Sequence, residues 1–563
     1  MKSLYFLVGL ALLCLSCETQ SPKITYTIGP QQNGEVQQLR IHLTTPAGAE
    51  GESILSFPDD AWGEVGFHAT IADIKVLNEE ATVTKRGDSG WIVIEHRPGL
   101  ETLEVEYVLE QDFELPVVTQ NDFRPIIQPD YFHVFSHNLF MLPAYVFESN
   151  EDEADVQLEW QGFPEDYVFQ NSFGRQERSQ LIEDVSENEF HTAIFAGGDL
   201  RSYSIDINGN EVAFGLRDNW EAFQDSTLVD ILSRTITAQR DFWEDHSQKY
   251  FSVSMIPTAE TQGYSYHGTG LTNSFAMSAS NNEYLEVEGL VHLMNHELQH
   301  NWIGHVIKND NEEEQYWFSE GFTEYYTLKN IANHSIYGMD ANYFITEFNR
   351  IVRELYSSPV GEAPNSDINY DNFWSSREYS RLPYIRGAVF AFYLDHKIQQ
   401  VSEGAQSLDD LMLTLKEEAE DSEQLLTHNY FLEVAYRFLN EDLSDFFYTH
   451  IEQGKLIDLE QMYSDFGMEY EPETQVFDLG FTFGADEVAI ATVDPESEAY
   501  KAGLRVGDTL AGRSIWYGNL TKTADFNVIR DGVEFSVSYV PVAVKPIPQL
   551  KDKTVNKEML SLR

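Results

Sequence analysis

One short motif constrains this chain more than any other feature of its sequence. Residues 295–302 read Asn-His-Glu-Leu-Gln-His-Asn-Trp, which places the pattern His-Glu-x-x-His at His296, Glu297 and His300. On a helix, residues four apart lie on the same face, so both imidazoles can reach one metal ion about 2 Å away. Two neutral imidazoles suit zinc, and Glu297 can contact a water on that metal. The alternative is a helix with two surface histidines.

A catalytic zinc site needs a third ligand and one open position. Glu320 lies in the segment 316–326, Tyr-Trp-Phe-Ser-Glu-Gly-Phe-Thr-Glu-Tyr-Tyr, whose aromatic residues would bury its charge. A buried charge is costly, so Glu320 needs a cation or a metal as its partner. Glu324, one helical turn further, suits a carboxylate that orients a ligand histidine. The acidic run 310–314 is expected to be a solvated loop. The residues themselves leave the ligand open among Asp310, Glu312, Glu313, Glu314, Glu320 and Glu324.

The charge of the chain excludes some classes of partner. The 563 residues include 36 Lys and Arg against 93 Asp and Glu, a formal net charge of −57. Phosphates would be repelled, so we expect no nucleic-acid partner and no binding to an anionic lipid surface through charge. With 42% hydrophobic residues, the chain can build sizeable cores, and its length suits roughly three or four domains.

The first 17 residues are expected to be a signal peptide. Lys2 supplies a positive charge, and the apolar run 4–15 is too short to span a bilayer. The run ends Leu-Cys-Leu-Ser-Cys and resembles a bacterial lipoprotein signal, which implies lipidation of Cys17. We therefore expect a lipoprotein anchored in the bacterial cell envelope, in the periplasm or at the cell surface, with secretion as the alternative. Both cysteines lie in this segment, so a metal site must use His and carboxylates.

Hydrophobic periodicity divides the rest of the chain. Alternating apolar and polar residues in 24–28, 38–43 and 103–109 predict strands and an antiparallel β-sandwich. Helical periodicity follows, with an expected helix over 227–246, the motif helix over about 286–305, and further helices from 386 to about 453. Residues 475–543 again favour strands. The pattern is typical of a multidomain α+β protein.

Two segments together resemble a known family. His296-Glu297-x-x-His300, followed by Trp317-Phe318-Ser319-Glu320-Gly321-Phe322-Thr323-Glu324-Tyr325-Tyr326, is similar to the gluzincin metallopeptidases, and is closest to the glycyl aminopeptidase family. The resemblance implies that Glu320 is the third zinc ligand. It also implies a β-rich N-terminal domain, a thermolysin-like catalytic domain and a C-terminal PDZ domain. The expected organisation is a signal peptide over 1–17, a β-sandwich over 18–175, a mixed α/β plus helical catalytic domain over 176–470, a PDZ-like β domain over 471–546 and a tail over 547–563.

Two further segments resemble functional parts of these enzymes. Tyr384-Ile385-Arg386-Gly387 is similar to their Tyr-x-Lys/Arg-Gly segment, which implies that the Tyr384 hydroxyl donates to the oxyanion. The segment 268–274, Gly-Thr-Gly-Leu-Thr-Asn-Ser, aligns with a family segment of the type Gly-Leu-Glu-His-x-x-Ser and implies substrate binding by Gly270, Leu271 and Thr272. Threonine stands where the family has an acid for the substrate's amino group. A hydroxyl cannot pair with an ammonium charge, so exopeptidase specificity is expected to change.

The C-terminal β region resembles a PDZ domain. Leu479-Gly480-Phe481-Thr482 is similar to the carboxylate-binding loop, and Val493-Asp494-Pro495 through Val506-Gly507-Asp508 is similar to the core of bacterial PDZ domains. Such domains bind a chain terminus by adding a strand to a sheet edge, so C-terminal peptides are expected partners.

These features predict a zinc-dependent peptidase, similar to aminopeptidases, that acts on peptides or proteins. A metal-activated water would attack the peptide bond, with Glu297 as general base. The first alternative is a lipid-anchored protein that binds peptides through its PDZ domain and has a degenerate metal site. The second is an unrelated zinc hydrolase on the same scaffold.

Overall fold

The computed structural model describes residues 22–61, 64–86, 90–149, 152–261, 263–422, 424–485, 488–552 and Leu560. The expected signal peptide, the lipidation site Cys17 and much of the tail lie outside the described residues. The chain forms two compact units. Unit 1 comprises Met1–Glu221 and Gln248–Glu283, and unit 2 comprises Ala222–Ser247 and Tyr284–Arg563.

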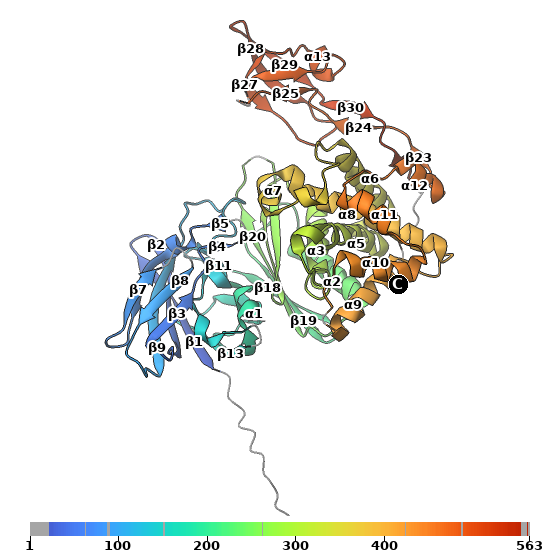
Figure 1. The fold of residues 1–563 in the computed structure, drawn as a ribbon. Coiled ribbons are helices and arrows are strands. Elements are labelled where there is room, and N and C mark those ends of the chain that lie inside the picture. Colours follow the sequence, from blue (N-terminus) through green and yellow to red (C-terminus); the bar gives the residue numbers. More distant parts are fainter. Residues whose placement is uncertain are drawn as a thin grey trace, which may run out of the picture. The chain divides into compact units, whose positions relative to one another are not determined.

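Unit 1 is built from β-sheets (Figure 1). Some of its strands, such as β13 (Glu153–Trp160), alternate buried and solvent-facing residues, whereas β11 (Tyr131–Phe135), β17 (Ile194–Gly198) and β22 (Ser274–Ser280) are buried along their whole length. A six-stranded sheet has the order β16 (Ser179–Ser186), β13 (Glu153–Trp160), β1 (Lys23–Asn33), β2 (Val36–Pro46), β9 (Thr102–Glu110) and β6 (Ile71–Val76). A four-stranded sheet has the order β12 (Leu142–Pro143), β3 (Glu52–Ser56), β8 (Trp91–Glu95) and β7 (Thr82–Arg86).

Two five-stranded sheets complete the main β structure of unit 1. One has the order β10 (Ile126–Ile127), β11 (Tyr131–Phe135), β17 (Ile194–Gly198), β14 (Val168–Asn171) and β15 (Gly174–Arg175), with α1 (Glu187–His191) before β17. It shares an apolar core with the six- and four-stranded sheets, to which Tyr26, Leu55 and Phe132 contribute. The other is mixed and has the order β18 (Arg201–Ile207), β19 (Asn210–Leu216), β20 (Tyr250–Thr258), β22 (Ser274–Ser280) and β21 (Tyr266–Leu271).

Unit 2 begins as a helical body, in which α5, α6 and α8 pack against one another (Figure 1). Apolar residues at helical spacing bury one face of α6, as at Phe344, Phe348 and Ile351. The helices are α2 (Asp225–Phe242), α3 (Val287–Gln299), α4 (Glu312–Ser319), α5 (Gly321–His334), α6 (Ala341–Ser357), α7 (Tyr370–Ser375), α8 (Arg377–Val401), α9 (Leu408–Ser422), α10 (His428–Leu439), α11 (Ser444–Phe447) and α12 (Leu459–Asp465). In the described part of the chain, no helix combines the length and the apolar character that crossing a membrane requires.

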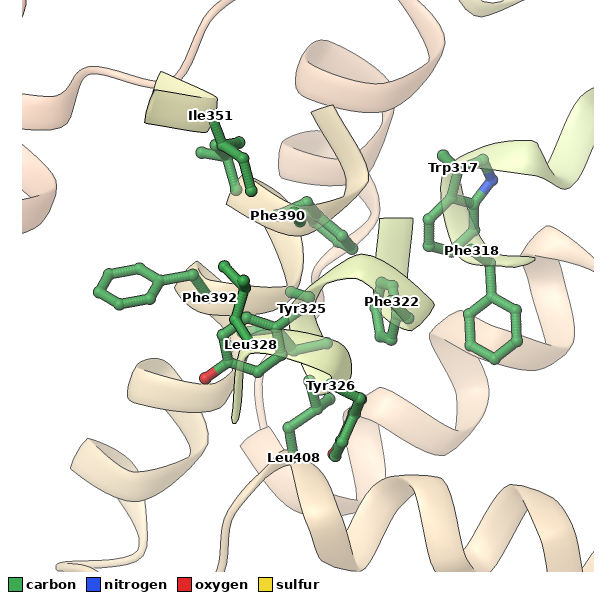
Figure 2. Close-up of a cluster of buried hydrophobic side chains, with 14 of the residues drawn as sticks. Trp317, Phe318, Phe322, Tyr325, Tyr326, Leu328, Ile351, Phe390, Phe392 and Leu408 are labelled. Atoms are coloured by element: carbon green, nitrogen blue, oxygen red, sulfur yellow. The ribbon is translucent and has the colours of Figure 1, made fainter. Parts of the chain in front are cut away.

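An aromatic cluster forms the core of this helical body (Figure 2). Trp317 and Phe322 lie edge to face, with ring centroids 5.7 Å apart, and Phe390 from α8 packs edge-on to Trp317 at 5.8 Å. The segment that carries Glu320 is therefore fixed by the packing of the aromatic residues around it.

The acidic run after the motif helix differs from expectation. Glu312, Glu313 and Glu314 are exposed, as expected, but they form the first turn of α4 and not a loop. Carboxylates at a helix N-terminus interact favourably with its dipole, which explains why a charge-rich segment becomes helical here.

Small β-sheets form the C-terminal part of unit 2. Some of them share a core of their own, which includes Phe481, Leu510 and Phe526, whereas Val476 and Leu550 belong to the core of the helical body. These sheets are β23 (Tyr470–Glu471) with β31 (Gln549–Leu550), β24 (Thr474–Phe477) with β30 (Val542–Lys545), β25 (Phe481–Phe483) with β26 (Ile490–Val493), and β27 (Thr509–Ser514), β28 (Ala524–Arg530) and β29 (Val533–Tyr539). A short helix, α13 (Glu498–Ala502), follows β26.

Candidate active site

The His-Glu-x-x-His motif occupies the C-terminal end of α3. The helix ends at Gln299 with His300 as its C-cap, so it is shorter than the expected 286–305. The Asn301 side chain donates to the Leu298 carbonyl at 2.9 Å, and Gly304 takes a φ of +114°, which favours glycine. His296 and His300 still face one another, with ring centroids 5.1 Å apart.

Neighbouring α2 anchors the motif helix through side-chain hydrogen bonds. The Gln239 amide donates to the Asn295 carbonyl at 2.7 Å, and the Trp243 indole donates to the Gln299 side chain at 2.8 Å. These bonds flank the motif residues, so the orientation of the last turn of α3 is fixed from outside the helix.

Glu320 reaches the two histidines because α5 and α8 approach one another closely. It lies at the junction of α4 and α5, and the next residue, Gly321, packs on Gly387 of α8. A Cβ built on Gly321 would lie 2.3 Å from the Gly387 Cα, so neither helix tolerates a side chain there. Glu320 Oε2 lies 3.2 Å from His296 Nε2 and 3.6 Å from His300 Nε2.

These three side chains fit a zinc ion. Ligands about 2.1 Å from a tetrahedral metal lie about 3.4 Å from one another, which matches the observed separations. The ligating atoms of His296, His300 and Glu320 all lie within 4.8 Å of one another. His300 Nδ1 is 3.0 Å from the Ile303 carbonyl, so Nδ1 carries the proton and Nε2 is free to bind a metal.

The charges at this site also favour a divalent cation. With neutral imidazoles, the carboxylates of Glu297, Glu320 and Glu324 and the guanidinium of Arg381 leave two negative charges. Burial alone would lower the pKa of His296, but its hydrogen bonds with Glu320 and Glu324 and the nearby carboxylates raise that pKa to about 10. The cluster therefore attracts positive charge. In the metal-free chain protons on the histidines supply that charge, and a bound cation would displace them.

Glu324 joins a second layer of groups behind His296. It is 1% exposed, and its Oε2 lies 3.0 Å from His292 Nε2 and 3.4 Å from His296 Nδ1. His292 Nδ1 lies 3.2 Å from the Tyr343 hydroxyl, and Arg381 lies 3.8 Å from the other oxygen of Glu324. The donors of His292, His296 and Glu324 are close enough to hold a metal themselves. His296 is shared, however, and turns Nε2 to Glu320 and Nδ1 to Glu324, the arrangement in which a carboxylate orients a metal-binding histidine.

Tyr384 and Glu297 provide two proton-carrying groups beside the cluster. The Tyr384 ring stacks on His296, with centroids 5.5 Å apart and an interplanar angle of 21°. Burial and the charges of Glu320 and Glu297 raise the pKa of Tyr384 well above its usual range, so the hydroxyl stays protonated and can donate. Burial also raises the pKa of Glu297, against the opposing effect of His296 and His300, and a raised pKa suits a group that takes and returns a proton.

Comparison with known proteins supports the fold. No protein-family model and no curated protein matches the sequence. The structure is similar to that of an aminopeptidase N family protein from Idiomarina loihiensis, with a TM-score of 0.72 and 15% identity over 96% of this chain and 99% of that chain. The fold is that of an aminopeptidase N family protein. The expected multidomain α+β class is thereby confirmed, with β-sheets first, a helical region and small β-sheets at the end.

More distant structures include an M1 zinc metallopeptidase from Deinococcus radiodurans, with a TM-score of 0.49 and 14% identity over 78% of this chain and 95% of that chain. A mutant of that enzyme bound to a Tyr-Ser-Ala substrate has a TM-score of 0.48, with 14% identity over 78% and 95% of the two chains. Both are too distant to add to the assignment of the fold.

The segment predicted to bind substrate lies in unit 1, whereas the metal cluster lies in unit 2. Gly270 and Leu271 end β21, an edge strand of the mixed sheet. Thr272 and Asn273 form the two-residue turn to β22, and Asn273 has a φ of +46°. The Thr272 N–H donates to the Thr192 carbonyl at 2.7 Å, and the two threonine hydroxyls lie 3.3 Å apart. Thr192 brings no carboxylate to Thr272, so these contacts supply no negative charge for a substrate ammonium group.

The predicted PDZ carboxylate loop belongs to the small β-sheets of unit 2. The Gly480 N–H donates to the Asp478 carboxylate at 2.7 Å, and the Leu479 carbonyl accepts from the Tyr539 hydroxyl at 2.6 Å. Phe481 starts β25 and belongs to the local core. A carboxylate of the chain thus already takes the Gly480 N–H, and the PDZ assignment stays a prediction.

Sequence reasoning missed two groups of the second layer. Tyr343 and Arg381 belong to no motif, and only the packing of α6 and α8 on α5 brings them to His292 and Glu324. Spacing offers a weak signal for Arg381, which precedes Tyr384 by one helical turn and lies with its guanidinium carbon 5.2 Å from the Tyr384 ring centroid.

Proposed function

We propose that this protein is a zinc-dependent peptidase. The observation that carries the proposal is the convergence of His296, His300 and Glu320 at ligand-to-ligand distances, with Glu297 and Tyr384 beside them. The similarity in fold to an aminopeptidase N family protein supports the same reaction class. The complete set of donors argues against the alternative of a peptide-binding protein with a degenerate metal site.

Each residue of the cluster has a distinct role in this mechanism. His296, His300 and Glu320 would hold the zinc, which lowers the pKa of water and polarises a carbonyl when bound. Glu297 takes the proton of the attacking water and passes it to the leaving amine. Tyr384 donates a hydrogen bond to the carbonyl oxygen as negative charge develops on it. Glu324 holds the His296 ring so that Nε2 faces the metal.

We further propose that the substrates are peptides and that recognition of their N-termini departs from that of the glycyl aminopeptidase family. Thr272 supports this proposal because a hydroxyl offers no charge to an ammonium group. A peptide library with free and blocked N-termini tests it. Similar cleavage of both sets is expected, and a strict requirement for a free amine would contradict the proposed role of Thr272.

The location and the C-terminal domain remain part of the same proposal. The N-terminal sequence supports a lipoprotein anchored through Cys17 in the bacterial cell envelope, with a secreted protein as the alternative. The sequence between Leu479 and Asp508 supports a PDZ domain that binds C-terminal peptides. Mass spectrometry of the mature N-terminus and peptide titration of the full chain address these two points separately.

The decisive test of the reaction is the substitution Glu297→Gln. The variant should bind zinc as wild type does, because Glu297 is not a ligand, and should lose peptide hydrolysis by about 10²–10⁴-fold. Glu288→Gln, an exposed position in the first turn of the same helix, is the matched control and should retain full activity. Hydrolysis by Glu297→Gln at the wild-type rate would exclude the mechanism.

A further inference from the structure

His292 lies one helical turn before His296 and has no role in the proposed chemistry. The two residues share a face of α3, and their rings stack with centroids 6.5 Å apart. The His292 side chain is 21% exposed, so the ring lies at the border of the metal cluster. Its two ring nitrogens contact Glu324 of α5 and Tyr343 of α6. His292 therefore connects three helices beside the proposed zinc site.

Glu324 makes its closest contact with His292. His292 Nε2 lies 3.0 Å from Glu324 Oε2, whereas His296 Nδ1 lies 3.4 Å from the same oxygen. Among the described residues, the other oxygen, Oε1, accepts no hydrogen bond, and Arg381 Nη2 is 3.8 Å away from it. A buried carboxylate is held in place by its hydrogen-bond donors. The position of the Glu324 carboxylate therefore depends chiefly on the imidazole of His292.

The donors and acceptors available to these side chains determine the direction of each contact. An ionised carboxylate only accepts, so His292 Nε2 and His296 Nδ1 carry protons where they face Glu324. A neutral imidazole has one donor and one acceptor nitrogen, which leaves His292 Nδ1 to accept from the Tyr343 hydroxyl at 3.2 Å. The same rule leaves a lone pair on His296 Nε2, as a metal ligand requires. Every contact from Tyr343 to His296 is thus compatible with one proton arrangement.

The same donors could instead hold a second metal ion, because the ligating atoms of His292, His296 and Glu324 lie within 4.8 Å of one another. Charge argues against this alternative. His296 Nδ1 could bind a second ion only if the ring lost its last proton, since Nε2 faces the first ion. The Arg381 guanidinium beside Glu324 would also repel a cation there. A hydrogen-bonded support fits the charges better than a second metal ion does.

We propose that His292 is a positioning residue of the metal site. It holds Glu324, which in turn holds His296 for zinc, and it binds no metal itself. The inference rests on the proposed function, because it needs zinc on His296, His300 and Glu320. Loss of a group that orients a metal ligand typically weakens metal binding by about 10–100-fold. His292 is one contact further from the metal, so its effect is expected at the lower end of that range.

The experiment measures zinc affinity of the full chain by competition with a chelator, with thermal unfolding of the metal-free forms as the check on folding. His292→Phe keeps a ring and removes both nitrogens, and should weaken zinc binding by about tenfold. His334→Phe is the matched control and should leave the affinity unchanged, because His334 ends α5 about 15 Å along the helix from Glu324.

Two amide substitutions keep the test decisive if His292→Phe does not fold. The amide nitrogen of His292→Gln can take the place of Nε2 and donate to Glu324, whereas the amide of His292→Asn is too short to reach it. The glutamine variant should therefore retain most of the wild-type affinity, and the asparagine variant should lose it. Equal affinities of these two variants would overturn the proposal.

A double-mutant cycle tests whether His292 acts through Glu324. In a Glu324→Gln background, His292→Phe should cause little further loss, because the carboxylate that His292 positions is gone. Two losses that multiply would indicate a merely structural role and would contradict the proposal. Two zinc ions per wild-type chain, one of which His292→Phe removes, would also contradict it. A chain that binds one zinc ion and shows the coupling but hydrolyses no peptide would refute the proposed function and support the role of His292.

Discussion

The contact between Glu324 and His296 offers the sharpest test of how this site is built. Substitution of Glu324 by Gln keeps the size of the side chain and removes its charge. The Glu324 carboxylate lies 3.4 Å from His296 Nδ1 and 3.0 Å from His292 Nε2, and it is 1% exposed. Glutamine can accept from His296 Nδ1 only through a neutral amide oxygen, so it would hold the His296 ring less firmly and would favour the proton on Nδ1 less.

The size of the effect follows from the neighbours of Glu324. Loss of a carboxylate that orients a metal-binding histidine typically weakens metal binding by about 10–100-fold, or about 1.4–2.7 kcal/mol. Arg381 does not become unpaired, since its Nε also lies 3.3 Å from Glu354. The loss should therefore fall on zinc affinity, with a much smaller change in the stability of the metal-free protein.

The assay is competition for zinc between the protein and a chelator at neutral pH, together with thermal unfolding of the metal-free forms. Glu354→Gln is the matched control: Glu354 contacts Arg381 and Arg350 but, in the described structure, has no contact with a histidine. It should change zinc affinity by less than about threefold. Wild-type affinity in a folded Glu324→Gln variant, or an equal loss in both variants, would refute the reasoning.

Three other predictions concern separate parts of the molecule. Tyr384→Phe should lower kcat by about 10²–10³-fold and leave zinc content unchanged in metal analysis. Lys329→Met should lower the free energy of unfolding in urea by about 3–5 kcal/mol, because the buried carboxylates of Asp395 and Asp409 both lose their ion pair with the Lys329 ammonium. Burial would raise the pKa of Glu260, but hydrogen bonds from the hydroxyls of Thr119, Thr258 and Ser280 outweigh burial and lower that pKa from 4.5 to about 2. The free energy of unfolding should therefore fall as the pH drops from 4.5 towards 2. Glu260→Gln should flatten that pH dependence in chemical denaturation.

The metal cluster was predictable where local spacing determines geometry. Residues four apart on a helix share a face, so His296 and His300 were expected to converge, and they do. Because aromatic residues surround Glu320, its carboxylate was expected to need a cation or a metal as its partner. Its Oε2 lies 3.2 Å from His296 Nε2 and 3.6 Å from His300 Nε2. The end of the motif helix was predicted wrongly, because the hydrogen bond from Asn301 and the backbone of Gly304 are local features that apolar periodicity does not report.

Contacts that depend on tertiary packing could not be predicted from the sequence. Tyr343 reaches His292 only because α6 packs on α5. The alternation of apolar residues indicated the strands of unit 1, but pairing register and sheet order involve strands far apart in the chain, such as β1 with β13.

The two units of the chain separate the residues proposed for catalysis from the segment proposed to recognise the N-terminus of the substrate. All five residues proposed for catalysis lie within unit 2, on α3 or at its C-cap, on α8, or at the junction of α4 and α5. Thr272 lies in a two-residue turn of unit 1, where a substitution would lose the hydroxyl contact with Thr192 at 3.3 Å but keep the backbone hydrogen bond to the Thr192 carbonyl. We therefore expect that the proposed hydrolysis and the proposed recognition of the N-terminus can change independently. A Thr272→Glu variant should gain preference for a free amine without any loss of zinc, and cleavage of matched free and blocked peptides measures that preference.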